Sequence, residues 1–191
     1  MVDAAPRSAL ADHLTPGRFG AEGHTGIAIS EVRDRTLVNL AGDGDILATA
    51  TGMSVPRSAG ETQSAGDDRL LWLAPDQWLL IGPATPFGER ERQLAAAAPD
   101  AAVNEVTFGR TTLRLAGPHA RDVLAKGCPL DLDSDVFGAG QCAQSLLGHL
   151  SVLIECREPD VLEVTVTRSY GADLLHWLTT AAAEYGYEVS A

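Results

Sequence analysis

The strongest constraint on the fold is a short stretch of sequence that occurs twice. Residues 35–42 read RTLVNLAG and residues 110–117 read RTTLRLAG, so both copies begin with Arg-Thr and end with Leu-Ala-Gly. In the second copy, Thr111, Leu113 and Leu115 alternate with more polar or smaller residues, which is the pattern of a half-buried strand. The glycine that closes each copy indicates a turn.

The similarity between the two parts of the chain continues beyond these strands. Each copy is followed by a short helix pattern closed by glycine, then by two apolar strand patterns joined by a turn with Pro and Asp, and last by a helix that begins with aromatic-Gly. The matching segments are 45–52 with 122–127, 70–82 with 150–166, and 87–98 with 170–186. Because the order of elements matches as well as the strings, the chain is predicted to contain an internal repeat.

The repeat defines the expected fold class. The sequence predicts an α+β fold of two strand-strand-helix-strand-strand-helix units, spanning about 25–102 and 103–191. Each unit alone would bury a modest apolar area, so we expect both to share one core within a single domain, residues 25–191. Residues 1–24 lack a firm pattern and are predicted to form an N-terminal arm that orders on a partner.

Two further segments carry local predictions. An extra strand is expected in the second unit at about 140–147, QCAQSLLG. Residues 54–68, SVPRSAGETQSAGDD, are rich in Ser, Gly and Asp and poor in apolar residues. This composition predicts a mobile loop.

The second copy leads into a helix through a glycine, an order that also occurs in phosphate-binding loops. Here Gly117 is followed by Pro118, which has no N–H to donate, and Lys126 is followed by Gly127 in place of a hydroxyl residue. A GxGxxG fingerprint is also missing. We therefore interpret the segment as a strand-to-helix turn, with Pro118 at the first helical position and Gly127 as a left-handed cap.

Charge and hydropathy exclude several classes of partner. The formal net charge of −12 disfavours nucleic acid and anionic membranes, because both attract basic surfaces. The N-terminus has no apolar segment of signal-peptide length, and the longest apolar runs are too short to span a bilayer. We expect a soluble, cytoplasmic protein with neither nucleic acid nor membrane as partner.

The sequence does not predict a metal site. Cys128, Cys142 and Cys156 form no CxxC pair, which favours a reducing compartment over a disulfide framework. His149 would complete a set of four ligands, but zinc sites usually take ligands from close pairs, so we interpret the cysteines as buried or incidental thiols. The acidic run 131–135, DLDSD, lacks the glycine and distal glutamate of a calcium loop and is interpreted as a solvated loop.

No group of residues forms a catalytic constellation, so no catalytic, cofactor-binding or metal residue is predicted. A GxSxG motif is absent, and Ser169 near His176 is interpreted as a helix cap beside a residue on the helix flank. Three residues remain as interface candidates: His149 at a probable hairpin turn, Arg168 at a strand–helix junction, and Trp72 on a strand. Each also has a structural alternative: His149 as an ordinary turn residue, Arg168 as the partner of a carboxylate within the fold, and Trp72 as a core residue.

Four strings of the chain resemble the gamma-subunit family of heterotetrameric sarcosine oxidase. They follow one another in the expected order over most of residues 70–186, whereas residues 1–65 resemble the family only loosely. The strings are LWLAPDQWLLIGP (71–83), GRTTLRLAGPHARDVLAKGCPLDL (109–132), GQCAQSLLGHLSVLI (140–154) and VTRSYGADLLHWLTTAAAEYG (166–186). The family is in turn similar to the folate-binding domain of the glycine-cleavage aminomethyltransferase, whose strand-Gly-Pro-helix element resembles residues 110–127.

This resemblance implies a non-catalytic gamma subunit of an enzyme that oxidatively demethylates sarcosine. The products are glycine, hydrogen peroxide and either formaldehyde or 5,10-methylenetetrahydrofolate. The implied partners are alpha, beta and delta subunits. FAD, FMN, NAD, tetrahydrofolate and zinc belong to those partners, and this chain is expected to hold no cofactor.

Two alternatives stay open from the sequence. One is a stand-alone tetrahydrofolate-binding one-carbon protein, and the other is the small subunit of a related N-methyl amino acid dehydrogenase. The chain is shorter than an aminomethyltransferase and lacks the extra domain that helps to close a full folate pocket. The resemblance therefore favours the subunit over the stand-alone protein.

Overall fold

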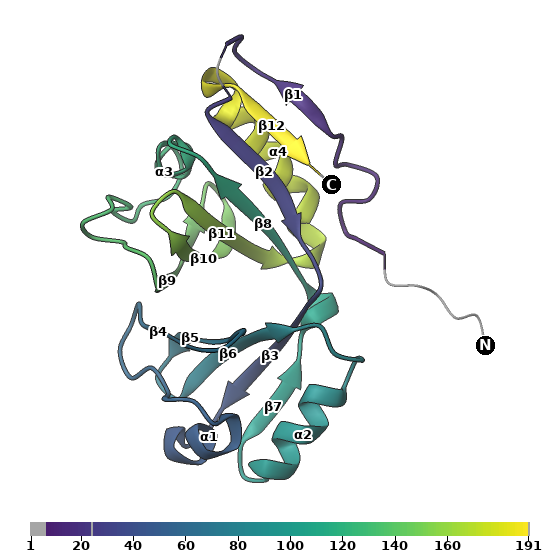
Figure 1. Ribbon diagram of the computed structural model, residues 1–191, viewed down its shortest axis with the longest axis vertical. Helices are drawn as coiled ribbons and strands as arrows, with labels where there is room; N and C mark the ends of the chain where they lie inside the picture. The colour runs from purple at the N-terminus through teal and green to yellow at the C-terminus, as the bar shows by residue number, and fades with distance from the viewer. Residues whose placement is uncertain (1–6, 24, 191) are drawn as a thin grey trace, which may run out of the picture.

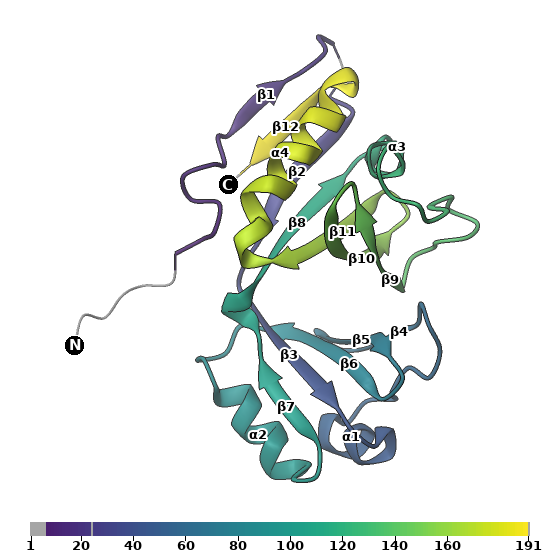
Figure 2. The ribbon, with the colours of Figure 1, turned by 180° about the vertical axis from the view of Figure 1, so that it is seen from behind.

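The computed structural model describes residues 7–23 and 25–190, and within them the chain forms twelve strands and four α-helices (Figure 1). The strands make two sheets, which we call the large sheet and the small sheet. Helices α1 and α2 lie against the outer face of the small sheet, and α3 and α4 lie against the outer face of the large sheet (Figures 1 and 2). The layers are therefore helix, sheet, sheet, helix.

The large sheet has the strand order β1-β12-β2-β8-β11-β10-β9. Its neighbouring strands are antiparallel, apart from the parallel pair β12 and β2. The strands are β1 (Gly17–Phe19), β2 (Ile27–Val32), β8 (Arg110–Ala116), β9 (Gln141–Leu147), β10 (Leu150–Glu158), β11 (Val161–Thr167) and β12 (Tyr187–Ser190).

The small sheet has the strand order β4-β5-β6-β3-β7, and all of its pairs are antiparallel. The strands are β3 (Arg35–Ala41), β4 (Thr62–Ala65), β5 (Asp68–Ala74), β6 (Gln77–Pro83) and β7 (Ala102–Glu105). The helices of the chain are α1 (Gly44–Thr51), α2 (Glu89–Ala97), α3 (Ala120–Ala125) and α4 (Gly171–Ala182). Short 3₁₀ turns cover Thr107–Gly109, Arg168–Tyr170 and Ala183–Tyr185.

The predicted α+β class is confirmed, and the two similar strings form corresponding strands, β3 and β8. Both strands have the same alternation of buried and half-buried residues. Each ends at a glycine in the left-handed half of backbone space, with φ of 147° at Gly42 and 135° at Gly117. The Gly42 N–H donates to the Asp76 carbonyl, in the turn between β5 and β6, and the Gly117 N–H donates to the Asp160 carbonyl, in the turn between β10 and β11. The extra strand predicted near 140–147 is β9.

The boundary between the two parts of the fold differs from the predicted one. Residues 25–32 were assigned to the first unit, but β2 lies in the large sheet between β8 and β12. The reason is the apolar face of β2, since Ile27 and Ile29 are buried in the core under α4. A tight turn at Asp34, with φ of 56°, then carries the chain into the small sheet.

Two segments without a clear sequence pattern are ordered by tertiary contacts. In the predicted arm, Leu10 is fully buried in the core of the large sheet, and β1 pairs with β12. The described part of the predicted arm, residues 7–23, is thus anchored on the large sheet at Leu10 and at β1, while residues 1–6 and 24 lie outside the described residues. The prediction of a mobile loop at 54–68 is wrong for β4, which pairs with β5.

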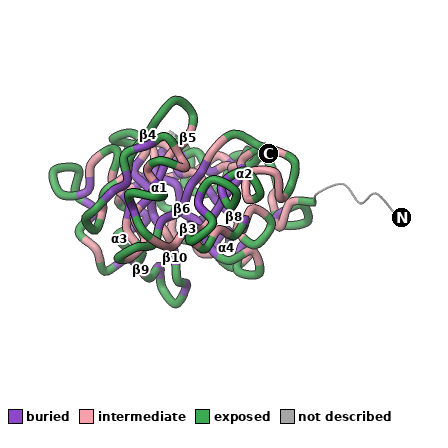
Figure 3. The backbone as a smooth tube through the Cα atoms, turned by 90° about the horizontal axis from the view of Figure 1, so that it is seen from below, coloured by how far each residue is buried: buried purple, intermediate pink, exposed green. Residues whose placement is uncertain are grey.

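The apolar side chains divide into three clusters, so the part of the core shared by the two sheets is smaller than predicted. One cluster lies between the large sheet and α3 and α4, and a second lies between the small sheet and α1 and α2. The third lies between the sheets and is formed by Leu37, Leu71, Leu79, Ile81 and Cys142. Viewed from below, buried backbone runs through the centre of the molecule and exposed segments surround it (Figure 3).

Candidate functional site at the junction of the two sheets

The layer between the sheets contains a buried ion-pair network centred on Glu163 of β11. The Glu163 side chain is only 2% exposed and accepts two hydrogen bonds from Arg35 of β3, at 2.5 and 2.9 Å. The Arg114 side chain, from the neighbouring strand β8, donates to the same carboxylate at 2.7 and 3.1 Å. One carboxylate therefore links a strand of the small sheet to two strands of the large sheet.

A second carboxylate extends this network. Glu155 of β10 accepts from Arg69 of β5 at 2.8 and 3.2 Å and from Arg157 at 3.0 Å. The Arg69 guanidinium also lies 3.7 Å from Glu163, so it joins the two carboxylates across the sheets. Buried charges of this kind are tolerated only when they are paired and hydrogen-bonded.

The pKa values of the buried acids differ in direction although the groups are neighbours. Burial raises the pKa of Glu163, but the hydrogen bonds and charges of Arg35 and Arg114 outweigh it and lower the pKa below its ordinary value. Burial raises the pKa of Glu155, and the charge of Arg69 opposes that rise. Burial, reinforced by the charge of Glu155, raises the pKa of Cys142 to about 12. At neutral pH this thiol is protonated and is a poor nucleophile.

The chain passes between the sheets at two places, and a groove opens beside them. The crossings are the turn at 33–34, between β2 and β3, and the 3₁₀ turn Thr107–Gly109, between β7 and β8 (Figure 1). The groove has a volume of about 260 Å³. We call it the waist groove and define it by its lining residues Arg7, Ser8, Glu31, Val32, Arg33, Asp34, Arg35, Leu37, Ala84, Thr85, Thr107, Phe108, Arg110, Thr112 and Arg168.

Three arginines of the waist groove have no carboxylate partner. Within residues 7–23 and 25–190, no aspartate or glutamate lies within ion-pair distance of Arg33, Arg110 or Arg168. The Arg168 guanidinium donates to the Arg7 carbonyl at 2.6 Å, and Arg110 makes only a long bond of 3.5 Å to Thr167. In a chain of net charge −12, these cations are available to an anionic group.

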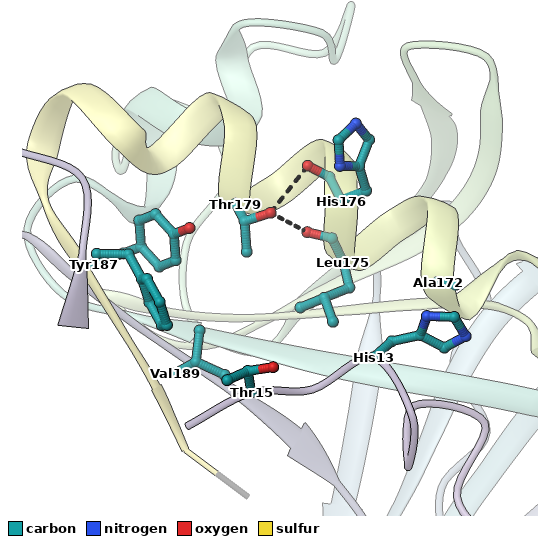
Figure 4. A pocket seen from close by; sticks show the side chains of 9 residues that line it. His13, Thr15, Ala172, Leu175, His176, Thr179, Tyr187 and Val189 are labelled. Carbon is teal, nitrogen blue, oxygen red and sulfur yellow. Dashed lines mark hydrogen bonds between the residues drawn. The ribbon is translucent and has the colours of Figure 1, made fainter. Parts of the chain in front are cut away.

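A separate pocket of about 320 Å³ lies between α4, β12 and the N-terminal segment (Figure 4). His13 comes from the N-terminal segment and His176 from α4, and their rings lie apart in Figure 4. The Thr179 hydroxyl donates to main-chain carbonyls of α4, at 2.9 Å to Leu175 and 3.0 Å to His176. Among the described residues, no hydrogen bond joins a hydroxyl of this pocket to a histidine ring, the arrangement that activates a nucleophile.

The structure places the three predicted interface residues in different surroundings. Arg168 lines the waist groove, and His149 is exposed at the turn between β9 and β10. Trp72 packs on the core of the small sheet and lies opposite Trp78 in the sheet. No hydrogen bond found in the described residues joins any two of the three. Only Arg168 lies beside other unpaired cations; the interface role of all three stays a prediction.

Three of the strings that resemble a known family meet at Trp177 of α4. A side chain at Gly127 would come within 2.5 Å of the Trp177 ring, and one at Gly148 would come within 3.1 Å. The Gly148 N–H also donates to the Gly127 carbonyl at 2.9 Å. The prediction of Gly127 as a left-handed cap is wrong, since its φ is not positive and the residue is small because the indole approaches it.

Two helix-start predictions also differ from the structure. Helix α3 begins at Ala120, two residues after Pro118, which lies in the preceding turn. Ser169 lies within a 3₁₀ turn, and no side-chain hydrogen bond caps α4. Each helix follows directly on a turn and has no side-chain cap. Pro118 and Ser169 lie in those turns, so they do not mark the first residue of the helix.

The cysteines lie in two different clusters. Cys142 belongs to the cluster between the sheets, whereas Cys128 and Cys156 are buried in the core of the large sheet. The part of the chain that the structure describes contains no group of three or more His, Cys, Asp or Glu side chains able to hold a metal ion. Across that same part, no helix has the length and apolar character that a membrane crossing requires.

Sequence reasoning missed both the ion-pair network and the waist groove. One signal was available, because Glu163 interrupts the apolar run VLEVTV and Glu155 interrupts LIECRE. A carboxylate inside an otherwise apolar strand indicates a buried ionic partner. The partner itself was not predictable, since Arg35 is 128 residues away from Glu163 in the sequence.

Comparison with known proteins first defines the class of fold. The structure is similar to the glycine cleavage system aminomethyltransferase T from Bartonella henselae, with a TM-score of 0.63 and 17% identity, over 84% of this chain and 49% of the other. It is also similar to a chain of the heterotetrameric sarcosine oxidase from Corynebacterium sp. U-96, with a TM-score of 0.85 and 27% identity, over 94% and 96% of the two chains. The fold is thus an α+β fold found in one chain of the sarcosine oxidase and in about half of the aminomethyltransferase chain.

Sequence comparisons then give the particular family. Sarcosine oxidase subunit gamma of Corynebacterium sp. (strain U-96) is 31% identical over 97% of this chain and 95% of its own length. The corresponding subunit of Arthrobacter sp. is 29% identical over 94% and 91%. Residues 35–184 match the family described as sarcosine oxidase, gamma subunit family. The chain belongs to this family.

Proposed function

We propose that this chain is the structural gamma subunit of a heterotetrameric sarcosine oxidase and that it contributes surface rather than catalytic groups. The observation that carries the proposal is the similarity to a chain of the heterotetrameric enzyme, with a TM-score of 0.85 over 94% of this chain and 96% of the other. The whole chain, rather than one motif, therefore corresponds to a component of an assembly.

The chemistry of the buried groups supports a structural role. The carboxylates of Glu155 and Glu163 are both occupied by arginines of the same chain. The raised pKa of Cys142, at about 12, keeps its thiol protonated at neutral pH. Glu155 and Glu163 thus hold the two sheets together, and neither they nor the Cys142 thiol is available as a base or nucleophile.

The finer features of the assembly follow from the proposal. Its partners are alpha, beta and delta subunits, which hold FAD, FMN, NAD, tetrahydrofolate and zinc, and the whole complex oxidises sarcosine. The three free, buried thiols accord with a reducing compartment, so we place the complex in the cytoplasm.

The test is isolation of the tagged chain from its own host, followed by partner masses, the visible absorption spectrum and oxidase activity. The expected result is three companion subunits, flavin absorption bands and hydrogen peroxide formation with sarcosine. Omission of this chain should lower the thermal stability or the yield of the complex. A fully active and equally stable complex without the chain would contradict the structural role.

The same preparation separates the alternatives. A complex that oxidises another N-methyl amino acid in place of sarcosine would indicate a related dehydrogenase. A solitary, colourless chain would overturn the subunit proposal, and titration with tetrahydrofolate would then test a stand-alone one-carbon protein.

A further inference from the structure

Two exposed aromatic side chains pack on one another at a tilt beside the waist groove. Phe87 is 59% exposed and Phe108 is 47% exposed, and their ring centroids are 5.2 Å apart. Phe108 lines the waist groove itself. Large exposed rings that pack on one another, rather than into the core, form an apolar patch of the kind that protein partners cover.

The same groove gathers cations that the chain does not neutralise. Most arginines of the protein pair with a carboxylate of the chain, as Arg35 and Arg69 do. Within the described residues, Arg33, Arg110 and Arg168 of the groove have no such partner, and neither do Arg92 and Arg121 elsewhere. The groove also has two acidic residues. Glu31 accepts a hydrogen bond from the Ser8 hydroxyl at 2.5 Å, and Asp34 forms no ion pair within the described residues. Arginine and aromatic residues together are typical of the energetic centres of interfaces.

The waist groove shares lining residues with a neighbouring cavity. A second, wider cavity of about 700 Å³ shares Arg7, Ser8, Phe108 and Arg168 with the waist groove. The two cavities are therefore neighbours, and their lining extends from the crossing between the sheets to the start of α4. Three unpaired arginines, Arg33, Arg110 and Arg168, line these two cavities, which makes the surface complementary in charge to an acidic segment.

We propose that another subunit of the complex docks in the waist groove through an acidic segment. Its carboxylates pair with Arg33, Arg110 and Arg168, and its apolar side chains cover the Phe87–Phe108 pair. This inference rests on the proposed function and adds the surface and the chemistry of the partner. Because both crossings between the sheets line the groove, such a segment contacts both halves of the fold and holds them in one orientation.

Competition for a place in the complex tests the proposal. The variant R33E/R110E and the untagged wild-type chain are co-expressed with the other subunits, and their ratio in the isolated complex is measured by mass spectrometry. The control R18E/R57E changes the net charge equally, but on exposed arginines of β1 and of the loop after α1. We expect R33E/R110E to be incorporated about 100-fold less well than wild type, since two close interfacial pairs are reversed.

The control variant should be incorporated within about twofold of wild type. Thermal unfolding of each isolated variant shows whether it is folded. If wild-type chain assembles and R33E/R110E assembles equally well, the docking surface is wrong while the proposed function stands. If wild-type chain does not assemble at all, the proposed function itself is wrong.

Two further experiments test the docking surface if R33E/R110E fails to fold. One uses a second pair of variants, and the other uses the wild-type protein. F108S should compete less well than wild type, whereas I46S, which removes a 39% exposed residue on α1, should not. In the wild-type protein, hydrogen exchange at 107–110 and 168–170 should be slower in the complex than in the isolated chain. Unchanged exchange in both segments would overturn the proposal.

Discussion

The two halves of the molecule contain nearly the same strand, β3 in one and β8 in the other, but the sheets built around these strands differ. Strands β3 and β8 have the same pattern of burial. Each ends at a glycine whose N–H donates to a hairpin turn, the β5–β6 turn for Gly42 and the β10–β11 turn for Gly117. In the small sheet, β7 pairs directly with β3. In the large sheet, β2 is inserted between β8 and the returning strand β12. The comparison shows that the repeated local sequence determines the strand and the turn that follows it. Which strand pairs beside it depends on other parts of the chain.

The inserted strand also changes the size of the core. The cluster under the large sheet contains 23 buried residues against 10 under the small sheet, and it includes Ile27 and Ile29 of β2 and Leu10 of the N-terminal segment. The helices differ in the same way, since α4 buries five residues and α2 buries only Leu94. A common origin of the two units stays a prediction.

The largest effect is expected where the two halves are joined. The substitution Glu163→Gln removes the carboxylate that neutralises Arg35 and Arg114 and should lower the free energy of unfolding by about 3–5 kcal/mol. Urea unfolding measures this loss. The control Glu158→Gln, at an exposed residue of the same sheet, should cost less than about 0.5 kcal/mol. Equal stability of the two variants would show that the network does not join the sheets.

Matched glycine substitutions compare the halves directly. Gly42 and Gly117 both have positive φ, but an added Cβ meets Ala101 at 3.2 Å in the first case and the Gly26 carbonyl oxygen at 2.5 Å in the second. Gly42→Ala should cost about 1–2 kcal/mol from backbone strain. Gly117→Ala should cost a further ~1–3 kcal/mol, because main chain of β2 has to move. Thermal unfolding of the two variants measures the difference, and a larger loss at Gly42 would contradict it.

The pH dependence of the free energy of unfolding should show that the ion-pair network holds the two sheets together. The folded pKa of Glu163 is lowered, so its contribution is fully present above the ordinary value of 4.5 and is lost as the pH falls through the folded pKa. The folded pKa of Glu155 is raised, so its contribution has the opposite sign and falls as the pH rises above 4.5. Urea unfolding as a function of pH should show both slopes. Glu163→Gln should abolish the acid-side slope that this residue causes; an unchanged slope would assign it to other groups.

The smallest effect is expected at exposed apolar residues of the two halves. Ile46 on α1 is 39% exposed, and Val136 in the loop before β9 is 56% exposed. Substitution of either by Ser should change the free energy of unfolding by less than about 0.5 kcal/mol, since little buried area is lost. Urea unfolding of the isolated chain checks this. If only one of the two variants lost more than about 1 kcal/mol in the free energy of unfolding, the substituted side chain would contribute more packing than its exposed fraction indicates.

Much of the fold could be predicted from local pattern. The strands at 35–41 and 110–116, the extra strand at 141–147 and the four helices follow from apolar periodicity and from glycine positions. The placement of β2, the docking of Leu10 and the strand β4 could not be predicted, because each depends on a neighbour distant in sequence. The same applies to the candidate site, whose unpaired arginines come from the turn after β2, the start of β8 and the turn before α4.

The sequence by itself determined the α+β class, the repeated strand-and-turn element and the strings that indicated the gamma-subunit family. These depend on neighbours along the chain, where spacing and residue type decide the outcome. Only the tertiary structure decided that β2 joins the large sheet, that Glu163 is shared by Arg35 and Arg114, and that three unpaired arginines meet at the waist groove. The reason is physical. Burial and charge pairing are properties of the space between elements, and a linear pattern does not specify which elements will face one another.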